Sequence, residues 1–154
     1  MNRRILTSAL AAFVLLIGAA FAVAQQFGTA AEAKAMLEKA VAALKANEAN
    51  EADALAKFNS PTGGFRDRDL YVFCFDMTTG KFNAHVNPAL MGTDSRALKV
   101  NGQPVGQMVY DAAKEGTVTT VDYEFPKPGT TQPVPKESFV TRVGNEGCGV
   151  GYYK

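Results

Sequence analysis

Cysteine and histidine are scarce in this chain, which has two cysteines and a single histidine among 154 residues. A structural zinc site needs four donors, and a catalytic one needs three and an open position. Cys74 and His85 share the segment LYVFCFDMTTGKFNAHVNP, residues 70–88, but no C-x-x-C, H-x-x-x-H or C-x-x-C-H motif accompanies them. The sequence therefore predicts no metal site and no cofactor.

An excess of charge of either sign is also lacking. Sixteen lysines and arginines face fifteen aspartates and glutamates, for a formal net charge of +1. No basic stripe is present that could compete for the phosphates of a nucleic acid. Nucleic acid is therefore not an expected partner.

Groups paired for catalysis are equally hard to find. Cys74 lies among aromatic residues in a predicted strand, where nothing lowers the pKa of its thiol. Asp67, Asp69 and Asp76 flank that strand in turn-like surroundings, which suits capping or solvation better than acid–base catalysis. We expect a protein that is not an enzyme. The rival hypothesis is a hydrolytic enzyme, which would show turnover of a substrate.

Residues 1–24 are predicted to form a cleaved secretory signal. Two arginines precede an apolar run, and Ala22-Val23-Ala24 has the small-x-small pattern of a cleavage site. An uncleaved anchor is the alternative, but the run of roughly 17 residues falls short of the about 20 that span a bilayer. Cleavage would leave one domain, residues 25–154, in the periplasm or secreted, where two cysteines can stay paired.

The start of this domain is predicted to be helical. Thr29 and Glu32 have the spacing of a capping box. The apolar residues after them recur at helical spacing: Ala33, Met36, Leu37, Ala40, Val41 and Leu44. We expect a helix to about Ala46 and a second one over residues 51–58.

From Leu70 onward the apolar period shortens towards two, which is typical of strands. A short helix is predicted from Val105 to Gly116, a residue suited to a left-handed cap. The proline-rich segment PKPGTTQPVPK, residues 126–136, is predicted to be a loop throughout, because proline cannot donate to a sheet. Strands are expected over residues 70–75, 81–86, 118–125, 137–143 and 148–153. Helices segregated from an antiparallel sheet of five strands make an α+β domain.

Five segments, in this order and spacing, resemble the single Cache domain of the second type, an extracytoplasmic relative of the PAS fold. They are ALAKFNSPTGGFRDRDLYVFCFD, NPALMGTD, VDYEFPKPG, VPKESFVTRV and GVGYYK, and the resemblance covers nearly all of residues 30–154. It implies a five-stranded antiparallel sheet with a long N-terminal helix on one face and a small-ligand pocket on the other. It also implies sensing of small carboxylates or amino acids for chemoreceptors and sensor kinases.

The sequence ends at Lys154, directly after the last predicted strand. We therefore expect a free periplasmic binding module for a small organic acid or amino acid, which signals through a receptor or sensor-kinase partner. By analogy with the family, Ala30 to Ala46 is a candidate surface for homodimerisation. The alternative is an interaction subunit with a filled core and no ligand.

The strand order that the resemblance implies makes the first and last strands neighbours at the centre of the sheet. Cys74 and Cys148 would then come within reach of each other. A disulfide that closes about 75 residues would stabilise the fold by about 4 kcal/mol in the chain-entropy model. Two buried free thiols are the alternative.

Lys136 is the main candidate for ligand binding. Strand alternation puts Lys136 and Ser138 on one face and Phe139 on the other. The resemblance places this lysine at a position that pairs with a ligand's carboxylate, and an ammonium over an apolar pocket requires such an anion. The alternative is a solvated lysine at the edge of the sheet.

Aromatic residues supply the other candidates. Tyr123 is similar to the family's tyrosine in the strand before the proline-rich loop. His85 is similar to a histidine that relatives place shortly before a proline, or else it is a structural imidazole. An aromatic wall for the ligand's apolar part, or plain core, is formed by Tyr71, Phe73 and Phe75.

Overall fold

The computed structural model describes residues 26–47 and 50–154. The predicted signal peptide lies outside the described residues. Within the described residues, no helix is both long enough and apolar enough to cross a membrane.

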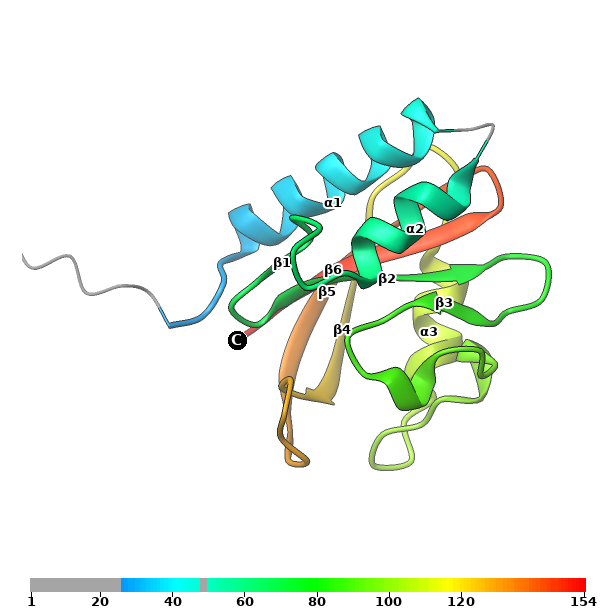
Figure 1. Cartoon of the computed structure of the whole chain (residues 1–154). Helices are drawn as coiled ribbons and strands as arrows, with labels where there is room; N and C mark the ends of the chain where they lie inside the picture. The colour runs from blue at the N-terminus through cyan, green and yellow to red at the C-terminus, as the bar shows by residue number, and fades with distance from the viewer. Residues whose placement is uncertain (1–25, 48–49) are drawn as a thin grey trace, which may run out of the picture.

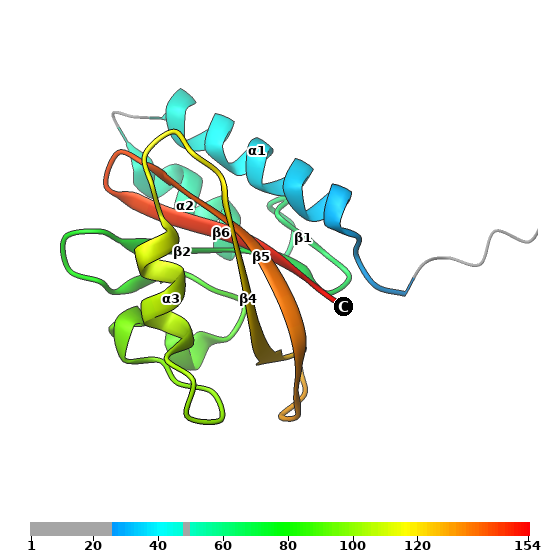
Figure 2. The same cartoon turned by 180° about the vertical axis from the view of Figure 1, so that it is seen from behind.

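The domain is α+β, as predicted, with an antiparallel sheet between two sets of helices (Figures 1 and 2). The strand order is β1-β2-β6-β5-β4, and β3 also pairs with β2. The elements are α1 (Ala30–Ala46), α2 (Glu51–Asn59), β1 (Arg66–Asp67), β2 (Leu70–Asp76), β3 (Phe82–Ala84), two 3₁₀ turns (Pro88–Leu90 and Ser95–Ala97), α3 (Val105–Ala112), β4 (Thr119–Pro126), β5 (Pro133–Val143) and β6 (Glu146–Tyr153). All five predicted strands are present, and the two-residue β1 is an addition.

Helix α1 begins at the predicted capping box. The Thr29 hydroxyl accepts from the Glu32 amide, and the Glu32 carboxylate accepts from the Thr29 amide. The buried residues of the helix are Ala33, Leu37, Ala40 and Leu44, all of them in the predicted apolar stripe. This stripe packs on the sheet, because α1 contacts β2, β5 and β6.

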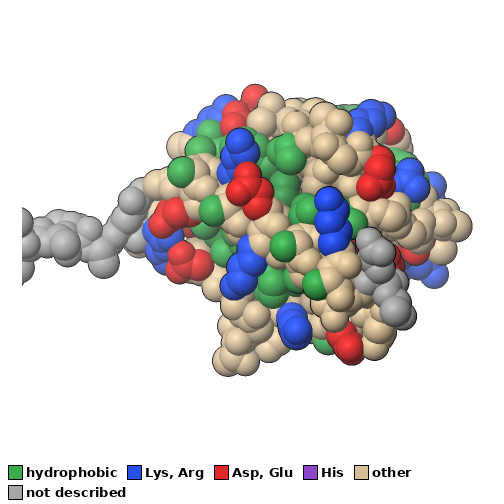
Figure 3. Space-filling view, turned by 90° about the horizontal axis from the view of Figure 1, so that it is seen from above, with side chains coloured by type: hydrophobic (Ala, Val, Ile, Leu, Met, Phe, Trp, Pro, Cys, Tyr) green, Lys and Arg blue, Asp and Glu red, His purple; other side chains and the backbone are tan. Residues whose placement is uncertain are grey.

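The outer face of α1 is visible in Figure 3, which looks down on the helix layer. Apolar side chains appear there in small groups between charged ones. Dimerisation through Ala30–Ala46 stays a prediction.

The sheet separates two hydrophobic clusters. Under α1 and α2, the first cluster contains Leu70, Val72 and Cys74 of β2. On the opposite side, next to α3, the second contains Tyr71, Phe73 and Phe75 of the same strand. Strand β2 is therefore buried on both faces, as its unbroken apolar run predicts.

Cys74 and Cys148 form the predicted disulfide between the two central strands. They are direct partners in the antiparallel register, with Cα atoms 4.1 Å apart. The bond lies on the side of α1 and α2, where both cysteines are fully buried.

Strand β6 has a glycine at every second position on the face towards α3. A Cβ at Gly147 or Gly149 would overlap the ring of Phe75 or Phe73, and one at Gly151 would overlap the side chains of Lys136 and Ser138. The glycines thus let large side chains of the neighbouring strands lie flat across β6. This row creates the space in which the candidate site is built.

The proline-rich segment is not a loop throughout, which corrects the prediction. Strand β4 runs to Pro126 and β5 starts at Pro133, so that only residues 127–132 form the turn. The Pro135 carbonyl accepts from the Lys154 amide, so Pro135 turns its nitrogen towards β6 and away from β4. Pairing with β4 therefore needs no donor from Pro135.

Two other elements are shorter than predicted. Strand β3 ends at Ala84 because the amide of His85 donates to the Asn59 side chain and not to a strand. Helix α3 ends at Ala112, where the chain turns so that the Lys114 carbonyl accepts from the amide of Arg142 in β5. Gly116 has a φ of 67° but lies in the following turn and is not the helix cap.

Candidate functional site

The structure brings the predicted site residues together on the face of the sheet towards α3. Strand β2 provides Tyr71, Phe73 and Phe75, β4 provides Tyr123, β5 provides Lys136 and Ser138, and His85 follows β3. Phe139 points to the other side and stacks on Tyr152, as alternation predicts.

Lys136 is a buried cation surrounded by aromatic rings. Its side chain is 1% exposed, so the alternative of a solvated edge lysine is wrong. The ammonium donates to the Tyr71 hydroxyl at 3.0 Å and lies 4.4 Å from the centre of that ring. The centres of the Tyr153 and Phe125 rings are 4.9 and 5.3 Å away. Three ring faces therefore attract the cation, in the manner of a cation–π cage.

No carboxylate forms an ion pair with Lys136 among the described residues. Burial lowers the pKa of Lys136 to about 7, and the charge of Asp69 acts in the opposite direction. Asp69 is itself buried, and its Oδ2 atom has no hydrogen-bond partner in the structure. Near neutral pH, both the charged and the neutral form of Lys136 are thus present.

Hydroxyl groups complete the polar part of the site. The hydroxyls of Tyr123 and Ser138 are 2.7 Å apart and share a hydrogen bond. Burial raises the pKa of Tyr123 to about 12 and that of Tyr71 well above its ordinary value. Both tyrosines are therefore protonated at neutral pH and can donate to a bound anion.

His85 is neutral in this environment. Its Nδ1 atom accepts from the Asn87 amide at 2.9 Å, which leaves the ring proton on Nε2. Burial and the nearby charge of Lys136 lower the pKa of His85 to about 3. The ring contacts those of Tyr71, Phe82 and Phe125, with centres 5.2 to 6.2 Å apart. His85 is therefore a packed, uncharged imidazole at any physiological pH.

Two hollows meet at the site. An inner cavity under α3 measures about 20 Å³, roughly the room for one water molecule. An outer groove of about 340 Å³ lies between the chain after β3 and the β4–β5 turn, and its size is that of a small-ligand pocket. Tyr71, His85 and Phe125 line both hollows and separate them. These three rings close the site in the described state.

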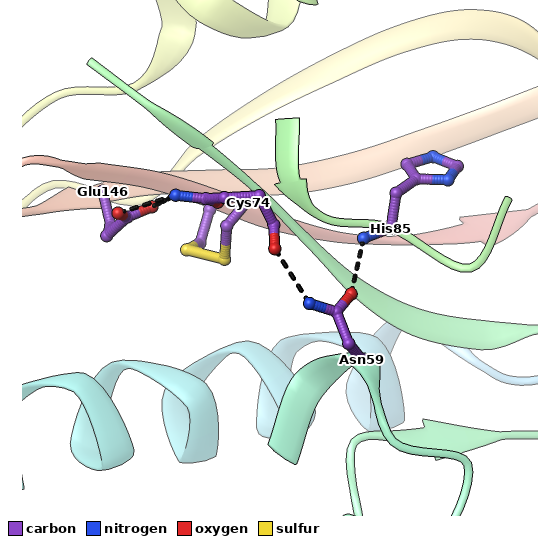
Figure 4. The surroundings of a disulfide bond; sticks show 6 residues. Asn59, Cys74, His85 and Glu146 are labelled. Atoms are coloured by element: carbon purple, nitrogen blue, oxygen red, sulfur yellow. Dashed lines mark hydrogen bonds between the residues drawn. A yellow bond between two sulfur atoms is a disulfide. The ribbon is translucent and has the colours of Figure 1, made fainter. Parts of the chain in front are cut away.

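A chain of hydrogen bonds connects His85 to the other side of the sheet (Figure 4). Asn59 of α2 accepts from the His85 amide and donates to the Asn83 carbonyl at 2.8 Å. The Asn83 side chain donates to both oxygens of Glu146, each at 2.8 Å. Glu146 and the disulfide lie on the helix side of the sheet, and the His85 ring points to the opposite side. The site is thus joined by hydrogen bonds to the layer of α2.

Replacement of Glu146 by glutamine is expected to change how stability depends on pH. Burial, with the charges of Glu51 and Asp76 facing it, raises the pKa of Glu146 to about 7 from 4.5. The folded protein then holds a proton that the unfolded chain releases, so this group's contribution is lost as pH rises through 7. The free energy of unfolding of Glu146→Gln minus that of wild type should therefore be about 2 to 3 kcal/mol larger at pH 8 than at pH 5. Denaturant titrations at both pH values measure the difference, and equal differences would contradict the expectation.

Three residues of the site were not predicted as such. Phe125 and Tyr153 complete the rings around Lys136, and Asp69 is the buried charge that acts on it. Alternation from Tyr123 gives the face of Phe125, and the glycine row of β6 indicates the face of that strand on which large side chains of its neighbours lie. Asp69 gives no such signal, since an aspartate next to a turn is typical of a cap.

The fold places the chain in the class of PAS-like α+β sensor domains. The family model described as "Single Cache domain 2" matches residues 18–153, and the chain belongs to this family. No curated protein matches the chain.

Solved structures of chemotaxis proteins are similar to this fold. A periplasmic sensor domain of a chemotaxis protein has a TM-score of 0.67 and 29% identity, over 80% of this chain and 93% of that one. A methyl-accepting chemotaxis protein from Vibrio parahaemolyticus RIMD 2210633 has a TM-score of 0.65 and 25% identity, over 80% and 86%. A Cache chemosensory domain, solved to explain carboxylic acid recognition, has a TM-score of 0.56 and 25% identity, over 78% and 84%.

Proposed function

We propose that this domain binds a small carboxylate or amino acid outside the cytoplasm, catalyses no reaction, and passes the signal to a receptor or sensor-kinase partner. One observation supports the proposal above all others. Lys136 is a fully buried ammonium for which the described residues provide rings and a hydroxyl but no ion-pair partner.

The energetics favour an anionic ligand. A buried charge without a partner is unfavourable by several kcal/mol, and an anion held in the same site offsets much of that. The Tyr71 hydroxyl is the present acceptor of the Lys136 proton. A carboxylate is a stronger acceptor than a neutral hydroxyl, because its negative charge adds a Coulomb attraction to the ammonium. The solved Cache domain for carboxylic acid recognition supports the same chemistry by similarity.

The ligand would enter through the outer groove and displace the three separating rings. The inner cavity alone is too small for an acid of several atoms. Movement of Tyr71 away from Lys136 would join the inner and outer hollows. A six-atom oxo or hydroxy acid could then gain at most about 9 kcal/mol, which allows micromolar sensing.

A thermal-shift screen with small carboxylates and amino acids tests the proposal. At about 100 times its dissociation constant, a true ligand adds about 2.7 kcal/mol, which raises the Tm by about 10 °C in a domain of this size. Lys136→Met keeps the length of the side chain but removes the charge, so it should fold and lose the shift. The control variant Lys57→Gln removes an exposed charge on α2 and should keep the ligand-induced rise in Tm. An unchanged shift in Lys136→Met would remove this lysine from the site.

The small inner cavity favours one alternative, an interaction subunit with a filled core. In that case no carboxylate or amino acid would raise the Tm of the wild-type domain. The same screen therefore separates the two functions.

A further inference from the structure

A second lysine lies at the rim of the outer groove. Lys127 directly follows β4 and lines the groove together with Tyr71 and Phe125, two of the rings that cover Lys136. Its ammonium lies 3.5 Å from the centre of the Phe27 ring. No ion pair among the described residues involves Lys127. The groove thus has one cation without an anionic partner at its rim, and a second, Lys136, lies behind two of its lining rings.

Both ammonium groups face the same aromatic ring. Lys127 is 5.5 Å and Lys136 is 4.9 Å from the centre of the Tyr153 ring. The two nitrogens therefore lie at most about 10.4 Å apart, and a four-carbon diacid with one carboxylate on each ammonium can bridge a gap of this size.

We infer that the groove selects a short dicarboxylate, with one carboxylate on Lys136 and the other on Lys127. This inference rests on the proposed function, because it assumes that Lys136 receives the first carboxylate. The intervening carbons would lie against Tyr71 and Phe125, which line the groove beside Lys127 and cover Lys136. A monocarboxylate of the same length would leave Lys127 on the Phe27 ring, as in the described state.

The second carboxylate also changes a contact outside the groove. Phe27 stands two residues before the cap of α1, and Lys127 is the cation that holds its ring. An anion that draws Lys127 into the groove weakens this contact. A dicarboxylate would therefore act on the start of α1 in a way that a monocarboxylate does not.

Calorimetric titration with succinate and butyrate, which have equal carbon chains and differ by one carboxylate, tests the inference near pH 7. Wild type should bind succinate more tightly than butyrate. Lys127→Gln should weaken succinate binding by about tenfold or more, the usual effect of losing a hydrogen bond between charged groups, and change butyrate binding by less than about twofold. Lys57→Gln removes the same charge on α2 and should change neither affinity. Phe27→Leu removes the ring that Lys127 covers and should keep the preference for succinate.

Each outcome separates this inference from the proposed function. Butyrate binding that depends on Lys136, with no preference for succinate, would overturn the second anion site and leave the proposed function intact. If Phe27→Leu loses the preference for succinate as fully as Lys127→Gln does, Lys127 acts only through its contact with the Phe27 ring. Binding of neither acid to the wild-type domain would overturn the diacid site, while binding of an amino acid in the thermal-shift screen would still support the proposed function.

Discussion

Replacing both Cys74 and Cys148 with alanine is expected to lower the free energy of unfolding by about 4 kcal/mol. The disulfide joins residues 74 positions apart and therefore restricts a large part of the unfolded chain. Its atoms are also fully buried between α1, α2 and the sheet, so their removal leaves unfilled space. Urea titration of both proteins measures the loss as a lower midpoint.

Reduction of the wild-type protein is the matched control, because it opens the same ring but keeps both sulfur atoms. The reduced protein should lose slightly less stability than the alanine variant. A loss below about 1 kcal/mol in both would contradict the chain-entropy argument for this bond. A loss in the alanine variant alone would show that packing, and not the cross-link, stabilises the two central strands.

Ligand affinity is expected to fall about tenfold per pH unit above pH 7, because only the charged form of Lys136 pairs with a carboxylate. Burial places the pKa of Lys136 at about 7, so the lysine of the empty site loses its proton above that value. A bound anion raises the pKa again, and binding must then take up a proton. Below pH 7 the lysine is already charged, and the affinity should be constant until the ligand itself is protonated.

Lys136→Arg is the matched control for this pH dependence. A guanidinium stays charged up to pH values above 12, so any binding that the variant keeps should be constant from pH 7 to pH 9. An affinity that falls equally in wild type and in Lys136→Arg would assign the pH dependence to another group. His85 does not provide one in this range, because its pKa is about 3.

Local patterns predicted the frame of the domain well. The capping box at Thr29 and Glu32 and the apolar stripe after it fix the start and the packed face of α1. The unbroken apolar run from Leu70 predicts a strand that is covered on both sides, and β2 has this environment. These signals are reliable because each depends on a few neighbouring residues and on one period.

The ends of elements were predicted less well, because they depend on contacts between distant segments. Strand β3 stops where Asn59 of α2 accepts from the His85 amide, and no residue near position 85 predicts this end of the strand. Strand β5 starts at Pro133 because the first proline positions of the strand extend past the end of β6, where no donor is needed. A rule that excludes proline from every strand overlooks such positions.

The predicted site residues do share one face, but their closed arrangement could not be read from the sequence. Alternation assigns Lys136 and Ser138 to one side of β5, and pairing with β4 puts Tyr123 beside them. The position of the ammonium against the Tyr71 ring depends on side-chain torsions and on Gly151 of β6, where a Cβ would overlap the Lys136 side chain. Asp69 affects Lys136 from a turn that is distant in sequence, and its burial has no local signature.

The most direct test of the central claim is a count of protons taken up when a carboxylate binds. Calorimetric titrations at pH 8 in two buffers with different ionisation enthalpies give this number. With a pKa of about 7 in the empty site, Lys136 should take up about 0.9 proton per ligand bound. Uptake should vanish in Lys136→Met together with binding. Tight binding of a carboxylate to wild type with no proton uptake would contradict the account, because the buried ammonium would then not be its partner.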